Sequence, residues 1–183
     1  FMMTRRSLST FMNAFTASDF TAYPFSTLND KDFTNLLSVY LDATFFPNLN
    51  ELDFMQEGHR FDFVEKDKSK DQIVLKGIVY NEMKGAMSSI SSQADQGLNE
   101  NLFPNHTYGY NSGGDPQDIP KLAYQNLLEF HKKHYHPSNA IFFTYGKIDI
   151  PTLQNEIQIN VLKHFSPSAE KIEVKESKYF NIN

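Results

Sequence analysis

The chain has 183 residues, no cysteine and a formal net charge of -5 at pH 7. Its length suits one ordinary domain, and a hydrophobic fraction of 40% is sufficient for a packed core. The lack of cysteine excludes disulfides, thiolate metal ligands and a cysteine nucleophile. The net charge is negative, and the sequence lacks the clusters of lysine and arginine that are typical of nucleic-acid-binding proteins. No apolar stretch approaches the length of a transmembrane helix. We therefore expect a soluble protein with neither nucleic acid nor a membrane as its partner.

The start of the chain predicts the end of a helix followed by two strands. Residues 7–12 suit the last turn of a helix. Residues 13–16 and 20–28 are rich in aromatic and β-branched side chains, which is typical of strands, and the tripeptide between them suits a tight turn. The first residue is phenylalanine, and no disordered lead-in precedes the expected helix. We therefore expect a chain that begins inside a domain.

The most regular apolar pattern predicts a helix that begins at Asn29 and ends before Pro47. Asparagine is favoured at a helix N-cap, and proline cannot continue a helix. Apolar residues recur at spacings of three and four positions along one face. They are Phe33, Leu36, Leu37, Tyr40, Leu41 and Phe45.

The middle of the chain predicts a strand, a charged loop and two helices. Residues 59–64 suit a strand, and residues 66–71 suit a solvated loop. Residues 76–90 show the apolar spacing of a second helix, and residues 93–103 suit a third. Residues 104–117 are rich in turn-forming residues and are expected to form a loop.

The last part of the chain predicts two more helices and one strand. Pro120 suits the first position of a helix that runs to about Tyr135. Residues 140–145 form a continuous apolar run typical of a strand, and Pro151 opens a last helix. Short strands that include a hairpin, mixed with helices, predict an α+β fold with a largely antiparallel sheet flanked by helices.

Glu82 stands out within the helix expected over residues 76–90. It lies three residues after Val79 and four before Ala86, so it falls on the apolar stripe of that helix. A carboxylate that faces a core is costly unless it is paired, protonated or bound to a metal ion. Two interpretations stay open: Glu82 lies at the edge of the stripe and reaches solvent, or it binds a metal ion.

Three histidines near the end of the expected fourth helix suggest a competing metal site. His131, His134 and His136 form the pattern H-x-x-H-x-H just before Pro137. Imidazoles three residues apart can share a metal ion. Histidine near a helix C-terminus also interacts favourably with the helix dipole, and His131 falls on the apolar side, where a hydrogen-bonded core histidine is common. We favour the structural interpretation of this cluster.

Several segments match one protein family in the order in which that family has them, up to about residue 150. The longest is residues 6–21, which begins Arg-Ser-Leu-Ser-Thr and contains Asn-Ala-Phe-Thr, and the strongest is residues 76–86, which contains Asn-Glu-Met-Lys-Gly. The other matching segments are residues 23–27, 39–43, 56–60, 108–109, 112–116, 130–131 and 134–140. Together they resemble the M16 (pitrilysin/insulinase) zinc metallopeptidases, and most closely the presequence protease-like branch.

This resemblance implies a zinc site and a site for peptide substrates. In that family, an H-x-x-E-H helix supplies two zinc-binding histidines and a glutamate general base. A further glutamate, within Asn-Glu-Met-Lys-Gly on a later helix, completes the metal set, and the matching residue here is Glu82. The strand that matches Asn13, Ala14, Phe15 and Thr16 is an edge to which an unstructured peptide adds as an extra strand. An ordinary structural edge strand is the alternative.

The sequence departs from the family at the motif that carries the chemistry. No H-x-x-E-H occurs in the chain, and in the family this motif precedes the Arg-Ser-Leu-Ser-Thr segment. We therefore expect residues 1–165 to be part of an M16 N-terminal catalytic domain, incomplete here, and residues 166–183 to begin the connection to the next domain. The chain is expected to contain no catalytic residue, to be inactive alone and to hold zinc weakly or not at all. Self-association through the face exposed by the missing part is a further expectation.

Two other functions stay open. A non-catalytic M16-like subunit would bind peptides or serve a structural role, although a site that has lost its metal has no need for the carboxylate of Glu82. If the resemblance is set aside, an α+β interaction domain without enzyme activity remains. For the parent peptidase we expect an intracellular location, in a bacterial cytoplasm or an organelle matrix.

Overall fold

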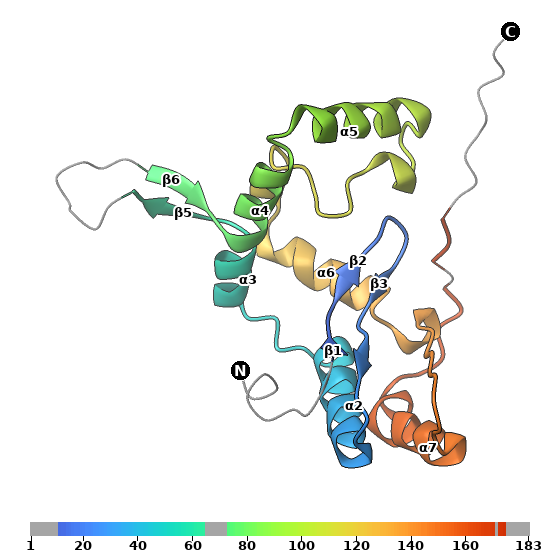
Figure 1. Ribbon diagram of the computed structural model, residues 1–183. Coiled ribbons are helices and arrows are strands. Elements are labelled where there is room, and N and C mark those ends of the chain that lie inside the picture. Colours follow the sequence, from blue (N-terminus) through green and yellow to red (C-terminus); the bar gives the residue numbers. More distant parts are fainter. Residues whose placement is uncertain (1–10, 65–72, 171, 175–183) are drawn as a thin grey trace, which may run out of the picture. The chain divides into compact units, whose positions relative to one another are not determined.

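The computed structural model describes residues 11–64, 73–170 and 172–174 (Figure 1). The chain divides into two compact units, each assembled from separate segments. The described residues of unit 1 lie within 11–15, 21–48 and 129–173, and those of unit 2 within 16–20, 49–64, 73–128 and 174. Helices and short antiparallel strand pairs give an α+β fold, as the sequence predicts.

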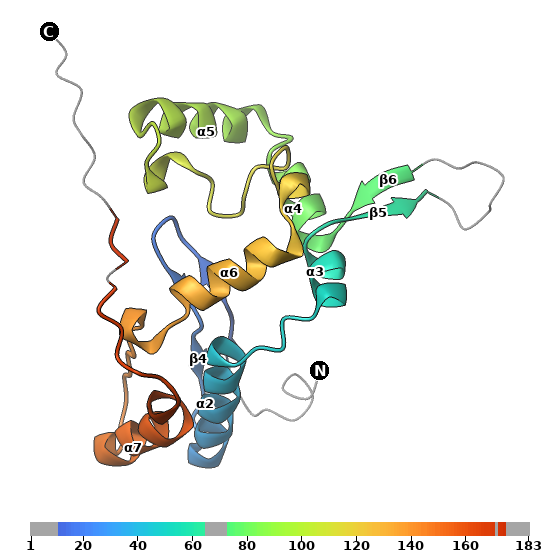
Figure 2. The same ribbon diagram turned by 180° about the vertical axis from the view of Figure 1, so that it is seen from behind.

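Unit 1 is organised around two helices, α2 (Asp30–Phe45) and α7 (Ile150–Asn160), which lie side by side (Figure 1 and Figure 2). Both were expected from their apolar spacing. Their contact is part of a buried cluster that consists of Leu41, Phe45, Leu153, Ile157 and Val161. The side chain of Val161 is 0% exposed, so this cluster is the core of unit 1.

The N-cap expected for α2 is confirmed. The side-chain oxygen of Asn29 accepts a hydrogen bond from the backbone N–H of Asp32 at 2.9 Å. This bond satisfies one of the amide groups that the first turn of a helix leaves without an internal partner. Phe46 is the C-cap residue, so the helix ends just before Pro47, as expected.

The strands near the start of the chain form a hairpin of two short pairs. Strand β1 (Phe11–Met12) pairs antiparallel with β4 (Phe25–Ser26), and β2 (Phe15–Thr16) pairs with β3 (Thr21–Ala22). The helix end expected over residues 7–12 is wrong at residues 11 and 12, whose backbone pairs with β4 instead. Residues 7–10 lie outside the described residues.

Proline interrupts this hairpin between its two pairs. The N–H of Asn13 donates to the carbonyl oxygen of Pro24 at 3.0 Å. Pro24 has no N–H to return the bond, and the hydroxyl of Tyr40 donates to the carbonyl oxygen of Asn13 at 3.4 Å. The strand is therefore tied to α2 at this residue.

Unit 2 contains a hairpin that leads into a pair of helices. Strand β5 confirms the expected strand, while the charged loop expected over residues 66–71 lies outside the described residues. The helices expected over residues 76–90 and 93–103 are also confirmed, with shifted ends. The elements of this part are α3 (Glu51–Glu57), β5 (Arg60–Phe63), β6 (Ile73–Lys76), α4 (Ile78–Ala86) and α5 (Ile90–Leu102).

Helix α6 (Tyr124–His134) begins four residues later than predicted. Pro120 lies instead in a short 3-10 helix, η2 (Ile119–Lys121). The buried side chain of Ile119, 6% exposed, anchors this turn. The other 3-10 helices are η1 (Thr107–Gly109), η3 (Pro137–Asn139) and η4 (Leu162–His164).

The strand predicted over residues 140–145 is not formed. The described residues offer it no pairing strand, and Ile141 and Tyr145 are 95% and 93% exposed. A strand is stable only when its backbone groups find hydrogen-bonding partners in a sheet. The apolar run therefore has the composition of a strand without the pairing that would make it one.

Candidate metal and substrate site

Helix α4, which carries Glu82, is fixed at its start by a close crossing of two glycines. A Cβ atom on Gly77 would lie 2.1 Å from the carbonyl oxygen of Gly58, so no larger residue fits there. The same carbonyl accepts a hydrogen bond from the N–H of Tyr80 at 3.3 Å, in the first turn of α4. The crossing therefore sets where the helix begins relative to the end of α3.

The β5–β6 hairpin before α4 is held by charges on one face. Its register places Arg60 opposite Lys76, with Asp62 two residues along β5. The carboxylate of Asp62 forms ion pairs with Arg60 at 3.3 Å and with Lys76 at 3.4 Å. Hydrogen bonds from the N–H of Phe63 and from Lys76 hold the pKa of Asp62 below its usual range. The chain therefore enters α4 from the β5–β6 strand pair, in which every residue of one strand has a defined partner in the other.

A loop braces the buried face of α4. Met83 is 8% exposed, and a Cβ atom on Gly113 would lie 2.3 Å from its sulfur. The side-chain amide of Asn111 donates to the sulfur of Met87 at 3.7 Å and accepts a hydrogen bond from the N–H of Gly113 at 2.9 Å. The loop therefore contacts α4 along the side that Met83 and Met87 share.

Glu82 lies on the exposed face of α4. The expected burial of its stripe is wrong, because Val79 is 38% exposed and Ala86 is exposed as well, while Met83 alone is buried. Among the described residues, none donates a hydrogen bond to the Glu82 carboxylate or forms an ion pair with it. The carboxylate therefore reaches solvent, where it is accessible to a ligand.

The described residues do not give Glu82 a complete set of metal ligands. Within that part of the chain, no group of three or more histidine, cysteine, aspartate or glutamate side chains could hold a metal ion. A carboxylate without a protein partner fits as one zinc ligand, since zinc accepts carboxylate oxygens beside imidazole nitrogens. Glu82 thus suits a single position of a larger ligand set.

Two of the three clustered histidines have structural contacts on α6. His131 Nε2 lies 2.9 Å from the carbonyl oxygen of Thr44, and its ring stacks on Tyr135 at a centroid distance of 4.5 Å. The ring of His134 stacks on Phe130 at 4.3 Å. These contacts match the structural interpretation of the cluster.

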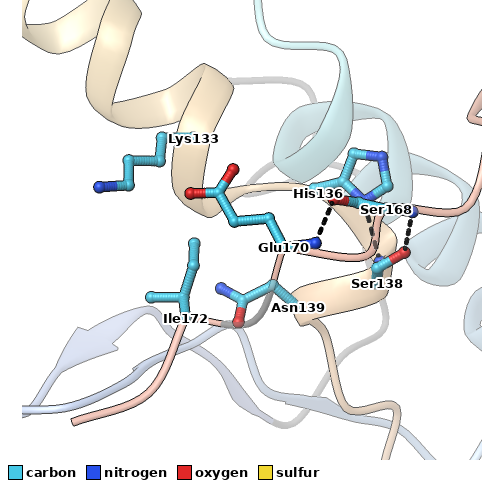
Figure 3. A pocket seen from close by; sticks show the side chains of 7 residues that line it. All are labelled: Lys133, His136, Ser138, Asn139, Ser168, Glu170 and Ile172. Atoms are coloured by element: carbon cyan, nitrogen blue, oxygen red, sulfur yellow. Dashed lines mark hydrogen bonds between the residues drawn. The ribbon is translucent and has the colours of Figure 1, made fainter. Parts of the chain in front are cut away.

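His136 caps a 3-10 helix beside a small cavity (Figure 3). Its Nδ1 accepts a hydrogen bond from the N–H of Ser138 at 3.1 Å. The hydroxyl of Ser138 accepts from the N–H of Ser168 at 3.1 Å, and the hydroxyl of Ser168 accepts from the N–H of Glu170 at 3.2 Å. The cavity has a volume of about 20 Å³, which suits about one water molecule and no peptide.

The strand expected over residues 13–16 is formed only at Phe15 and Thr16, which are β2, while Asn13 and Ala14 connect β1 to β2. All four residues are exposed. The N–H of Ala14 donates to the side-chain oxygen of Asn13 at 2.9 Å. Thr16 falls within unit 2 together with Glu82, and the other three residues belong to unit 1. The strand is therefore accessible, as an edge for a peptide must be.

One hydrogen bond within unit 2 joins two residues that no sequence pattern paired. The hydroxyl of Tyr108 donates to Asp19 Oδ2 at 2.9 Å, although 89 residues separate the two in the chain. Neither periodicity nor spacing can reveal a contact over such a separation. The only signal was that both residues lie within segments that match the M16 family.

Among the described residues, no helix has the length and apolarity needed to cross a membrane.

Comparison with known proteins identifies the family. A family model described as "Peptidase M16 inactive domain" matches residues 121–181. The chain is also similar to three proteins named "Presequence protease, mitochondrial". It is 54% identical to that of Xenopus laevis over 165 residues, 57% to that of Danio rerio over 159 residues, and 53% to that of Schizosaccharomyces pombe over 150 residues.

These three matches cover 90%, 87% and 82% of this chain, but only 16%, 15% and 15% of the relatives. The chain thus spans about a sixth of the length of the curated relatives that it matches. High identity to presequence proteases over most of the chain agrees with the ordered motifs and with the α+β fold. The chain belongs to the M16 peptidase family, within the branch of the presequence proteases.

Proposed function

We propose that this chain is part of a longer zinc-dependent metalloendopeptidase that hydrolyses unstructured peptides. The observation that carries the proposal is the match of the Asn-Glu-Met-Lys-Gly segment, which contains Glu82, in a chain of the M16 family. The Glu82 side chain is exposed, so its carboxylate is accessible to a metal ion. The relatives are named as proteases, which supports a peptidase as the parent protein.

In this proposal, Glu82 is one zinc ligand, and the rest of α4 keeps it in place. The Gly58–Gly77 crossing fixes the start of the helix, and the contact between Met83 and Gly113 fixes its buried face. A carboxylate on a helix held at both places needs little reorganisation to bind a metal ion. Zinc, when bound, supplies the Lewis acidity that activates a water molecule for attack on a peptide bond.

The chain supplies the third ligand of the zinc set but not the general base. No H-x-x-E-H occurs in its sequence, so the two histidine ligands and the catalytic glutamate must come from other residues of the parent. We therefore expect the 183-residue chain to be inactive alone.

Substrate binding is assigned to the exposed strand of Asn13, Ala14, Phe15 and Thr16. Main-chain hydrogen bonds to an added strand give affinity with limited sequence preference, which suits varied unstructured peptides. We also propose that residues 1–165 belong to the catalytic domain and residues 166–183 begin the connection to the next one. The printed names of the relatives favour a mitochondrial location for the parent.

A non-catalytic M16-like subunit is the second candidate. It is favoured by the description of the matching family model as an inactive domain. That match covers residues 121–181, however, and Glu82 and the expected substrate strand both lie outside it. The peptidase therefore remains the better proposal.

The test is the zinc content of the longer protein, purified as the wild type and as Glu82→Gln. The substitution keeps the shape of the side chain and removes the charge that a metal ligand needs. Glu100→Gln is the matched control, because Glu100 is an exposed glutamate on the neighbouring helix α5 that pairs with Gln96 at 2.8 Å.

We expect one zinc ion per wild-type and Glu100→Gln molecule, with chelator-sensitive hydrolysis of an internally quenched peptide. We expect much weaker zinc binding and no hydrolysis for Glu82→Gln. Equal zinc in all three proteins would remove Glu82 from the ligand set. A wild type without zinc and without hydrolysis would favour the non-catalytic subunit.

A further inference from the structure

The turn between β2 and β3 is tied to a distant loop by one side-chain hydrogen bond. The hydroxyl of Tyr108 donates to Asp19 Oδ2 at 2.9 Å. The turn is closed by the N–H of Ala17, which donates to the carbonyl oxygen of Phe20 at 2.8 Å. All four residues belong to unit 2, so the contact lies within one compact unit.

Tyr108 is itself held firmly in η1. Its ring meets Phe103 edge-on at a centroid distance of 6.0 Å and lies 5.1 Å from the ring of His106, whose Nδ1 accepts a hydrogen bond from the N–H of Tyr108. The carbonyl oxygen of Gly109 accepts from the side chain of Gln96 at 3.0 Å. A Cβ atom on Gly109 would lie 2.3 Å from the carbonyl oxygen of Phe103, so η1 packs directly against the end of α5.

The residues that follow reach α4. We call residues 107–114 the connector loop, because its first part carries Tyr108 and its last part carries Asn111 and Gly113. Gly113 contacts Met83, which is buried in α4 and follows Glu82 in the chain, and Asn111 contacts Met87, the C-cap residue of α4. One short loop thus touches both the β2–β3 turn and the candidate metal helix.

We propose that the hydrogen bond between Tyr108 and Asp19 positions Thr16, the residue of the candidate substrate strand that belongs to unit 2, relative to the candidate metal helix of the same unit. The inference rests on the proposed function, in which Thr16 contacts the substrate and Glu82 binds zinc. Thr16, the last residue of the strand, is separated from Asp19 by only two residues, so a shift of the turn shifts the end of the strand.

The chemistry of the Tyr108–Asp19 hydrogen bond suits a contact that holds the turn in one position. A hydrogen bond to a carboxylate is stronger than one between neutral groups. The bond and the charge of Asp19 raise the pKa of Tyr108, so its hydroxyl keeps its proton at neutral pH and continues to donate. Tyr108 acts through Asp19 and the turn, and is therefore a positioning residue.

The test uses the longer protein and an internally quenched, unstructured peptide as substrate. Tyr108→Phe removes only the hydroxyl, and Asp19→Ala removes only the acceptor. Asp19→Asn is the matched control, because its side-chain carbonyl can still accept the hydrogen bond. KM, kcat, zinc content and the thermal midpoint are measured for each variant.

We expect Tyr108→Phe and Asp19→Ala to raise KM by about three- to tenfold, the range available from one hydrogen bond. We expect kcat and zinc content to stay near those of the wild type, since α4 keeps its other contacts. The double variant should be no worse than either single one, and Asp19→Asn should stay within about twofold of the wild type.

Unchanged KM in Tyr108→Phe and Asp19→Ala, with an active wild type, would overturn the inference and leave the proposed function standing. A lower thermal midpoint without a change in KM would overturn it too, because the bond would then serve stability alone. A wild type that neither binds zinc nor cleaves the peptide would overturn the proposed function and this inference together.

Discussion

Replacement of Gly77 by alanine tests whether the crossing with Gly58 fixes helix α4. The added Cβ would lie 2.1 Å from the carbonyl oxygen of Gly58 and 2.7 Å from both its carbonyl carbon and the Cα of His59. Ordinary contacts of a Cβ atom begin at 3.4 Å, so the carbonyl oxygen would have to move by about 1.3 Å and the two carbon atoms by about 0.7 Å each. Overpacking of this kind costs about 1–3 kcal/mol or more, and we expect about 3 kcal/mol because all three neighbours are main-chain atoms.

Gly85→Ala in the same helix is the matched control. Its added Cβ would meet nothing within 4 Å. Alanine is favoured over glycine in a helix by up to about 1 kcal/mol, so the control should stabilise the protein or leave its stability unchanged. The two variants make the same chemical change, one at the N-cap of α4 and one within the helix, and the structure predicts opposite signs for their effects on stability.

The assay is urea unfolding followed by far-ultraviolet circular dichroism, with hydrogen exchange of the α4 amides as a local measurement. Gly77→Ala should lower the unfolding midpoint and speed exchange in the first turn of α4, where Tyr80 bonds to Gly58. If both alanine variants change stability by the same amount and in the same direction, the crossing does not fix the helix. Glu82 would then not be held in place by the crossing of Gly58 and Gly77.

Four further predictions follow from the fold. Leu41→Ala, which empties a position that is 5% exposed in the core of unit 1, should cost about 2–5 kcal/mol in chemical unfolding, whereas Leu28→Ala, at a side chain 97% exposed, should cost almost nothing. Asn29→Ala should cost about 1 kcal/mol by the same measurement, because Asp32 loses its capping acceptor, and Asn29→Asp should retain the cap. Burial and the charge of Lys133 lower the pKa of His134 from its ordinary 6.5. Just below pH 6.5, the imidazole of His134 therefore binds a proton more readily in the unfolded chain than in the folded chain. The melting temperature should fall as the pH falls through this window, and His134→Gln should make its dependence on pH weaker. Light scattering should give a mass above 21.1 kDa for the chain if its exposed apolar residues self-associate, and Phe143→Asp, at a side chain 84% exposed, should lower that mass, whereas a monomeric wild type would contradict the prediction.

Local patterns were sufficient for most of the helices. The stripe from Phe33 to Phe45 predicts α2 because a helix of this length buries one continuous face, and its N-cap and following proline mark the two ends. Pro151 likewise marks the start of α7. In these segments the backbone finds its hydrogen bonds within a few residues, so the sequence nearby contains the information that decides the structure.

Strands were predicted less well because their partners lie elsewhere in the chain. Residues 140–145 have the composition of a strand, but no described strand pairs with them. Strand β6 was missed, although it pairs with β5 over four residues. Composition reports the preference of a segment for the extended form, while pairing depends on which other segment is brought beside it.

The candidate site was likewise predicted in part by local sequence patterns and decided in part by the tertiary structure. Periodicity placed Glu82 on an apolar stripe, and the M16 motifs made it a candidate metal ligand, which stays a prediction. Its exposure agrees with the interpretation that Glu82 reaches solvent. Helical spacing left this open, because it shows which residues share a face and does not show whether anything covers that face.

The sequence by itself determined the fold class, the main helices and, through its ordered motifs, the M16 family. Only the tertiary structure decided that Gly58 and Gly77 cross at the start of α4, that Gly113 packs on Met83, and that Tyr108 bonds to Asp19. The physical reason is that each of these contacts joins residues far apart in the chain. Their distances are set by the packing of whole elements, which no local run of residues contains.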